Sequence, residues 1–208
     1  MKLKLITILI TLFAFMFLTA CGGSQAGNSE SETESVNFVT HEDPDLGVTV
    51  SYPEGWITHN SIGGLTVASD QKAVDSESMA DIGDAGFVLI IPGEIDVLNF
   101  QTNQEISEDA PLPALFIYQQ LLEEGGQDYL GVEAPRELEL DGQTVAITLA
   151  KTTIDGVDVM TLLAVIMHDG QIALISAGAQ ADSFVSLRPS FEQIIQSIQV
   201  TTPAELSQ

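Results

Sequence analysis

Apolar runs and Asp-Gly pairs alternate regularly in the second half of the chain. Asp141-Gly142, Asp155-Gly156 and Asp169-Gly170 lie fourteen residues apart, between runs rich in β-branched residues such as TVAITLAKTTI and VDVMTLLAVIMH. Asp-Gly is a preferred pair for a two-residue type I′ hairpin, because glycine tolerates the positive φ that this turn demands. The stretch from Val132 to Ala179 therefore predicts four strands in an antiparallel meander.

The run from Val157 to His168 is apolar on both of its faces in the middle. A central strand of this kind has to be covered on both sides, which argues against a sheet with one face open to solvent. Two amphipathic segments are the predicted covers. The first is a helix over Pro113 to Glu124, and Gly125 is its stop. The second contains Leu187 to Ile198 at helical spacing, with Pro189 near its start.

Four shorter runs upstream of these segments are also predicted to be strands. They are Val36 to Thr40, Val48 to Tyr52, Leu65 to Ser69 and Gly86 to Ile91. Together with the meander they predict the α+β class. We expect an antiparallel β-sheet of about six to seven strands with helices on both faces, which is an α/β/α sandwich.

The first twenty residues follow a different pattern from the rest. Lys2 and Lys4 precede an apolar run from Leu5 to Leu18 that only two threonines interrupt, and small residues close the segment. This is the pattern of a secretory signal peptide, predicted over residues 1–20. The apolar run is shorter than the ~20 residues that a spanning helix needs, so a permanent transmembrane helix is the weaker interpretation.

The tetrapeptide Leu18-Thr19-Ala20-Cys21 resembles the lipobox of bacterial lipoproteins. The resemblance implies that a diacylglycerol is attached to the Cys21 thiol, that the preceding peptide is removed, and that the new amino terminus is often acylated as well, for instance with palmitate. The alternative is an ordinary cleaved signal with a chance cysteine beside it. Cys21 is the only cysteine of the chain, so an intramolecular disulfide and a multi-cysteine metal site are excluded.

The lipobox and the composition that follows it predict the domain organisation and the location. Residues 21–35 are rich in Gly, Ser and Glu and predict a flexible acidic tether. One domain is predicted over residues 36–200, and a loose polar tail over 201–208. We expect the chain to be anchored in the cell membrane through lipid on Cys21, on the extracytoplasmic side, facing the periplasm or the cell surface.

Charge excludes one class of partner. The 208 residues include 30 acidic and 6 basic ones, with a formal charge of −24 and 45% hydrophobic residues. Phosphate neutralisation needs clustered Lys and Arg, so nucleic acid is excluded as a partner. Loss of Lys2 and Lys4 with the signal leaves four basic residues against thirty acids, a formal charge of −26. The acids are spread along the chain, which favours a role in solubility over a localised site.

Three features of the domain resemble the PsbP-like family, which includes the Ran-binding Mog proteins and many bacterial lipoproteins. GVTVSYPEGW, from Gly47 to Trp56, is similar to the family's opening strand with Tyr-Pro-x-Gly-Trp. The antiparallel meander is the second feature, and FEQIIQSIQV, from Phe191 to Val200, resembles the closing helix and its Ser-Ile-x-Val. The resemblance implies an α/β/α sandwich and no activity.

The residues that could carry chemistry form no familiar motif. Glycine-rich nucleotide loops, the Gly-x-Ser-x-Gly elbow and His-Glu-x-x-His are missing from the sequence. His41-Glu42-Asp43-Pro44-Asp45 could offer oxygen ligands to a hard cation, but it lacks the spacing of a calcium loop, and a solvated acidic turn is the favoured interpretation. His59 and His168 have no evident partner, and His168 is expected to point to solvent. Trp56 is expected to pack on the sheet rather than stack on a ligand.

These observations favour a non-enzymatic lipoprotein whose domain binds or scaffolds another component of the cell envelope. We expect no cofactor and no metal, the membrane as one partner through Cys21, and an envelope protein as the other. The alternative is a lipoprotein that binds a small ligand or a cation. Two less favoured hypotheses are an accessory factor of a photosynthetic complex and a hydrolase whose Ser, His and Asp side chains converge only in the folded protein.

Overall fold

The structure is a computed structural model that describes residues 36–61, 63–96, 106–107, 110–124 and 129–204. All of these residues belong to one of the chain's two compact units, Val36–Gln208. The predicted signal peptide, Cys21 and the predicted tether lie outside the described residues.

The Asp-Gly hairpins of the meander are confirmed. The strands are β7 (Arg136–Leu140), β8 (Gln143–Ile154), β9 (Val157–His168) and β10 (Gln171–Gln180), which pair antiparallel in chain order. Asp141, Asp155 and Asp169 have φ angles of 50°, 53° and 47°, and the glycines after them have φ angles of 83°, 79° and 76°. Two successive positive φ angles define the type I′ turn, whose twist matches that of the flanking strands.

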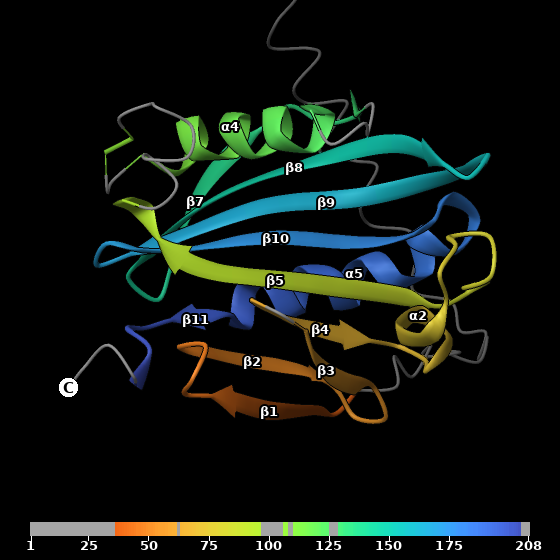
Figure 1. Cartoon of the computed structure of the whole chain (residues 1–208), viewed down its shortest axis with the longest axis horizontal. Coiled ribbons are helices and arrows are strands. Elements are labelled where there is room, and N and C mark those ends of the chain that lie inside the picture. Colours follow the sequence, from red (N-terminus) through yellow and green to blue (C-terminus); the bar gives the residue numbers. More distant parts are fainter. Residues whose placement is uncertain (1–35, 62, 97–105, 108–109, 125–128, 205–208) are drawn as a thin grey trace, which may run out of the picture. The chain divides into compact units, whose positions relative to one another are not determined.

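The described strands form two antiparallel sheets rather than the single sheet that the sequence predicted (Figure 1). The larger sheet has the order β3 (Ile57–Ser61), β4 (Gly64–Ala68), β5 (Gly86–Glu94), β10, β9, β8 and β6 (Leu130–Gly131), and β7 also pairs with β8. The smaller sheet has the order β1 (Phe38–Asp43), β2 (Val48–Pro53) and β11 (Gln199–Val200). Both edges of β2 are occupied, by β1 and β11, so β2 has no edge left to join β3.

Both faces of β9 are buried, as its sequence predicts. Leu162, Ala164 and Ile166 belong to one apolar cluster, which contains residues of helix α5 (Ala181–Ser197). The alternate residues Leu163, Val165 and Met167 belong to a second cluster, which contains residues of helix α4 (Pro111–Glu124). Successive strand residues point to opposite faces, so each helix packs against its own set of side chains. The fold is α+β and dominated by antiparallel strands.

Helix α4 agrees with the prediction except at its start. It begins at Pro111, two residues before the predicted Pro113, and it ends at Glu124 as predicted. The Tyr118 hydroxyl lies 2.8 Å from Ser176 Oγ on β10, which fixes the helix on the sheet. Burial raises the pKa of Tyr118, so this hydroxyl stays protonated and available as a hydrogen-bond donor.

Helix α5 starts earlier than the sequence predicted. It begins at Ala181, and Pro189 lies inside the helix instead of near its start. A proline inside a helix leaves the carbonyl four residues before it without a helical partner. That carbonyl belongs to Val185, which is 78% exposed, so water can satisfy it. The first turn is held by Phe184, which is buried, and by Ser183, whose Oγ lies 2.9 Å from Asp84 Oδ1.

The segment after α5 is attached to the smaller sheet and to β8. Gln143 Nε2 donates to the Ile198 carbonyl at 2.8 Å, and Gln143 Oε1 accepts from the Val200 amide at 3.0 Å. The Thr201 amide donates to the Gly47 carbonyl at 2.9 Å. Gly47 has a φ of +65°, and a Cβ there would collide with the Thr201 carbonyl oxygen, so only glycine fits this contact. The tail that we expected to be loose is therefore attached at its first residue.

Replacing Gln143 with alanine is expected to destabilise the fold. The Gln143→Ala variant leaves the Ile198 carbonyl and the Val200 amide buried without their partner, which costs about 2–4 kcal/mol for two such groups. Urea unfolding followed by circular dichroism measures the change. The matched control is Gln196→Ala on the exposed side of α5, and an equal loss in both variants would contradict the role of Gln143.

Candidate functional site

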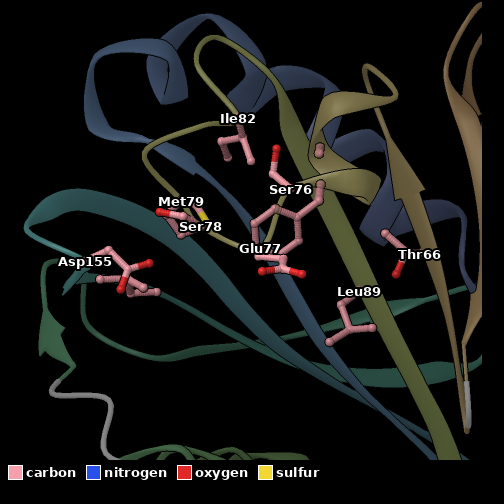
Figure 2. Close-up of a pocket in the computed structure, with 11 residues that line it drawn as sticks. Thr66, Ser76, Glu77, Ser78, Met79, Ile82, Leu89 and Asp155 are labelled. Carbon is pink, nitrogen blue, oxygen red and sulfur yellow. The ribbon is translucent and has the colours of Figure 1, made fainter.

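A cavity of about 260 Å³ lies at the end of the larger sheet where β5 begins (Figure 2). On β5, Phe87 and Leu89 lie opposite Gly178 and Ser176 of β10. Residues directly opposite each other in an antiparallel pair share a face, and Ser176 bonds to Tyr118 of α4. Phe87 and Leu89 are therefore on the face of the sheet that α4 packs against.

A loop, and not α4, covers this end of the face. The main contacts of α4 are with β7, β8 and β9. The start of β5 is covered by α2 (Lys72–Asp75) and the loop after it, residues 76–82. The cavity lies between this loop, β4, β5 and the β8–β9 hairpin. Eleven residues line it: Thr66, Ala73, Ser76, Glu77, Ser78, Met79, Ile82, Phe87, Leu89, Ile154 and Asp155.

Hydrogen bonds hold the loop in place. Gln180 Nε2 donates to the Met79 carbonyl at 2.7 Å, and the Asp81 amide donates to the Ser78 carbonyl at 3.1 Å. The contact between Asp84 and Ser183 ties the end of the loop region to α5. The wall of the cavity is thus formed before any ligand arrives, as is usual for small-molecule sites.

Gly178 leaves room for the aromatic ring at the floor of the cavity. A Cβ at Gly178 would lie 3.2 Å from Phe87 Cζ and 3.2 Å from Thr161 Oγ1. Such distances are tighter than ordinary van der Waals contact, so the ring would have to shift if residue 178 carried a side chain. The glycine therefore lets Phe87 lie close over β10.

Two carboxylates give the cavity a negative charge. Glu77 and Asp155 are exposed, and neither side chain has a hydrogen bond or ion pair among the described residues. The lining contains no basic residue, no histidine and no cysteine. Lys151, on the strand that leads to Asp155, is paired with Asp158 at 2.6 Å. The cavity can therefore offer carboxylate oxygens, the hydroxyls of Thr66, Ser76 and Ser78, and apolar contact.

A second cavity of about 290 Å³ lies on the other side of Ile82 and is lined by Asp70, Lys72 and Asp84 among others. Asp70 accepts the Lys72 amide at 2.8 Å, and Asp84 is engaged by Ser183. Its aspartates already have partners within the fold. The cavity above Phe87 is therefore the better candidate site.

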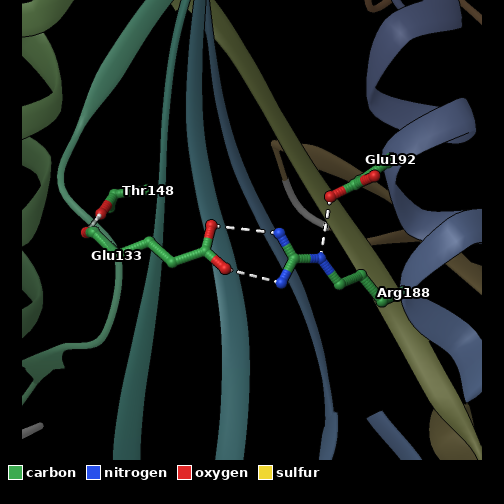
Figure 3. A network of polar contacts seen from close by, with 4 residues as sticks. All are labelled: Glu133, Thr148, Arg188 and Glu192. Atoms are coloured by element: carbon green, nitrogen blue, oxygen red, sulfur yellow. Dashed lines mark hydrogen bonds and ion pairs between the residues drawn. The ribbon is translucent and has the colours of Figure 1, made fainter. Parts of the chain in front are cut away.

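An ion-pair network at the edge of β8 has a structural role (Figure 3). Arg188 of α5 donates to both carboxylate oxygens of Glu133, at 2.7 and 3.0 Å, and to Glu192 at 2.8 Å. Thr148 Oγ1 on β8 donates to the Glu133 carbonyl at 2.8 Å. The hydrogen bonds from Arg188 lower the pKa of the Glu133 carboxyl below its ordinary value. The network joins the edge of the sheet to α5 and uses one of the few basic side chains.

The histidines singled out in the sequence do not converge. His41 is on β1, His59 is on β3, and His168 ends β9, where its side chain is 37% exposed and lies 3.5 Å from Asp169. Within the described ranges no three His, Cys, Asp or Glu side chains are grouped as metal ligands. Cys21, the one site residue predicted from sequence, lies outside the described residues.

The acidic turn after β1 is structural in part. Asp43 is 8% exposed, and its carboxylate accepts the Leu46 amide at 3.0 Å and Asn60 Nδ2 at 2.6 Å. A purely acidic surface turn would be solvated. Asp43 is instead buried, because it joins the smaller sheet to β3. Trp56 packs as expected: its ring meets the ring of Phe191 edge to face, with centroids 6.1 Å apart.

Comparison with solved structures shows the fold. The structure is similar to cyanobacterial PsbP from Synechocystis, with a TM-score of 0.55 and 14% identity over 88% of this chain and 99% of that one. The fold is PsbP-like. The Saccharomyces cerevisiae Ran-binding protein Mog1p has the same fold, with a TM-score of 0.51 and 12% identity over 80% of this chain and 96% of that one. No family model and no curated protein sequence matches the chain.

The PsbP-like fold of the described residues includes no helix that is long and apolar enough to cross a membrane. Most of the residues around the cavity lie outside the features that suggested this fold; Ile154 and Asp155 belong to the meander. Asp155 was recognisable as a turn residue and Phe87 as part of a strand. No signal in the sequence brings either of them beside Glu77.

The contribution of Glu133 to stability is expected to depend on pH. Its pKa is lowered in the folded state, so its contribution is complete above the ordinary value of 4.5 and is lost as the pH falls through the folded value. Glu133 is 40% exposed, so we expect Glu133→Gln to cost no more than about 1 kcal/mol at pH 7.

Urea unfolding of the wild type and of Glu133→Gln between pH 3 and pH 7 measures this dependence. The two unfolding free energies should differ most near pH 7 and converge in acid. Glu139→Gln, on the exposed side of β7, is the control and should show no such convergence. A difference for Glu133→Gln that grows as the pH falls would contradict the role of the ion pair.

Proposed function

We propose that the chain is an exported lipoprotein, anchored by acyl chains on Cys21, whose PsbP-like domain is a non-enzymatic binding module of the cell envelope. The observation that carries the proposal is the sequence Leu18-Thr19-Ala20-Cys21 at the end of an apolar run that follows Lys2 and Lys4. Two or three acyl chains on one residue make a stable anchor, since each buried methylene contributes about 0.8 kcal/mol.

The tether gives the domain freedom to reach a partner. The fourteen residues GGSQAGNSESETES between Cys21 and Val36 have the composition of a flexible chain, with an end-to-end distance of about 20 Å. The domain carries a large excess of acids, and anionic lipid headgroups repel it over a Debye length of about 8 Å. We expect the domain to stand away from the leaflet and to meet partners there.

We also propose that the domain is an α/β/α sandwich. The support is that α4 and α5 pack with alternate residues of β9, whose side chains point to opposite sides of the larger sheet. This is the arrangement implied by the resemblance to the PsbP-like family. The smaller sheet adds to the α5 side, since Val48 and Val50 of β2 belong to the same apolar cluster as Phe191.

The lining of the cavity contains no histidine, so a Ser-His-Asp hydrolase has no support there and binding is the better proposal. The same cavity favours the second candidate, a lipoprotein that binds a small ligand or a cation, because its apolar floor and two carboxylates without a partner among the described residues suit such a ligand. The only support for a role beside a photosynthetic complex is similarity of fold, and fold does not determine function.

Removal of the thiol tests the anchor. The Cys21→Ala variant cannot accept the diacylglycerol, so it should move from the detergent-rich phase to the aqueous phase in a Triton X-114 separation of cell extracts. Ser24→Ala, three residues along the tether, is the matched control and should stay in the detergent-rich phase. If Cys21→Ala remains with the detergent as fully as the wild type, the chain is not a lipoprotein.

A further inference from the structure

The cavity above Phe87 combines an apolar surface with an acidic one, and few kinds of ligand match both. Its floor and one wall are apolar: Met79, Ile82, Phe87, Leu89 and Ile154. Its mouth carries the carboxylates of Glu77 and Asp155, which come from two segments of the chain far apart in sequence (Figure 2). A ligand that fills the cavity has to bring apolar surface to the floor and positive charge to the mouth.

We infer that this cavity binds a small organic cation, a compound with an ammonium group on an apolar body. The inference rests on the binding function proposed above and names its ligand class. It does not require the anchor at Cys21, because every residue that it uses belongs to the described part of the domain.

The charge of the site favours a cation over an anion. The lining holds two acids and no basic residue. Lys151, on the strand that leads to Asp155, is engaged with Asp158, and Lys72 of α2 lines the neighbouring cavity instead. A phosphate or carboxylate ligand would meet like charges without a counter-ion. A phospholipid headgroup is disfavoured as a ligand for the same reason, because its phosphate is negatively charged even where the headgroup also carries an ammonium.

The apolar floor favours an organic cation over a metal ion. Calcium takes six to eight oxygen ligands, and magnesium keeps several waters and an octahedral shell. The lining offers only two carboxylates and the hydroxyls of Ser76, Ser78 and Thr66, beside six apolar side chains. An ammonium group on a hydrocarbon body needs fewer oxygens, and its body removes the apolar floor from water.

The aromatic ring and the volume bound the size of the ligand. Phe87 is half-buried, so part of its ring remains open to the cavity, and a cation within about 6 Å of a ring is attracted to its face. The volume of about 260 Å³ lies below the ~300–1,000 Å³ of sites for drug-sized molecules. A single ring or a short alkyl chain beside the ammonium fits this space.

The three Asp-Gly turns supply an internal comparison. Asp141, Asp155 and Asp169 share the same positive φ and the same type of turn, but only Asp155 lines the cavity. Asparagine adopts positive φ readily at this position of a hairpin, so an Asp→Asn change removes one charge and keeps the turn. Asp155→Asn and Asp141→Asn therefore change the net charge equally and differ in their distance from the proposed site.

Calorimetric titration of the purified full chain in a mild detergent tests the inference. The probes are 2-phenylethylammonium, its neutral counterpart 2-phenylethanol, phosphoethanolamine and Ca²⁺. We expect the ammonium to bind at least about tenfold more tightly than the alcohol, with an affinity that falls as salt is added. Phosphoethanolamine, which places a phosphate beside the same ammonium, is expected not to bind.

The variants locate the binding. Glu77→Gln and Asp155→Asn should each raise the dissociation constant of 2-phenylethylammonium about three- to tenfold, because each removes one partly screened charge from the mouth. Asp141→Asn should leave it within about twofold, the size of a long-range effect of net charge. Both substitutions in the cavity are on exposed residues, so unfolding curves should match those of the wild type.

Four results would overturn the inference. Equal binding of the alcohol and the ammonium would make the cavity a neutral apolar site, and equal effects of Asp155→Asn and Asp141→Asn would reduce the binding to general attraction by an acidic surface. Displacement of the ammonium by Ca²⁺ at comparable concentration would make the site a metal site. Failure of all probes to bind, with Cys21→Ala still released from the detergent phase, would overturn the ligand class and leave the anchored envelope protein standing.

Discussion

The burial of both faces of β9 is the constraint on which the rest of the structure depends. From Val159 to Met167 only Met160 is partly accessible, and every second residue points to the opposite side of the sheet. Each face therefore needs its own apolar cover, since leaving one open would expose several branched side chains to water. Residues of α5 and of α4 belong to the two separate apolar clusters that contain alternate residues of β9, and the neighbouring strands β8 and β10 are buried along with β9.

The two faces are closed to different degrees, and this difference produces the candidate site. On the side of α5, the smaller sheet and the residues around Gln143 complete a large cluster that includes Trp56 and Phe191. On the side of α4, the helix lies over β8 and β9, and a loop covers the start of β5. A loop fills space less completely than a helix with an apolar face, so Phe87 and Leu89 remain half-exposed at the floor of a cavity.

Because the chain has few basic residues, the acids at the cavity have no counter-charge among the described residues. Arg188 forms ion pairs with two glutamates at the edge of β8, and Lys151 forms one with Asp158. The carboxylates at the cavity have no such partner among the described residues, so their charge faces solvent and whatever enters the cavity. A chain richer in Lys and Arg could have neutralised the mouth, and the same cavity would then favour neutral ligands.

The local elements and the class of fold follow from the sequence alone. Asp-Gly spacing set the hairpins, because two positive φ angles suit few other pairs, and the apolar spacing of Pro113 to Glu124 predicted α4 to within two residues of its start. The sequence failed where a distant contact outweighs a local preference: it placed Pro189 near the start of the helix, but Phe184, which is buried, and Ser183, which contacts Asp84, hold an earlier turn. The folded chain alone reveals that β2 pairs with β11 instead of β3, and that Glu77 and Asp155 line one cavity. Those contacts join segments many residues apart, and periodicity carries no information on which distant segments become neighbours.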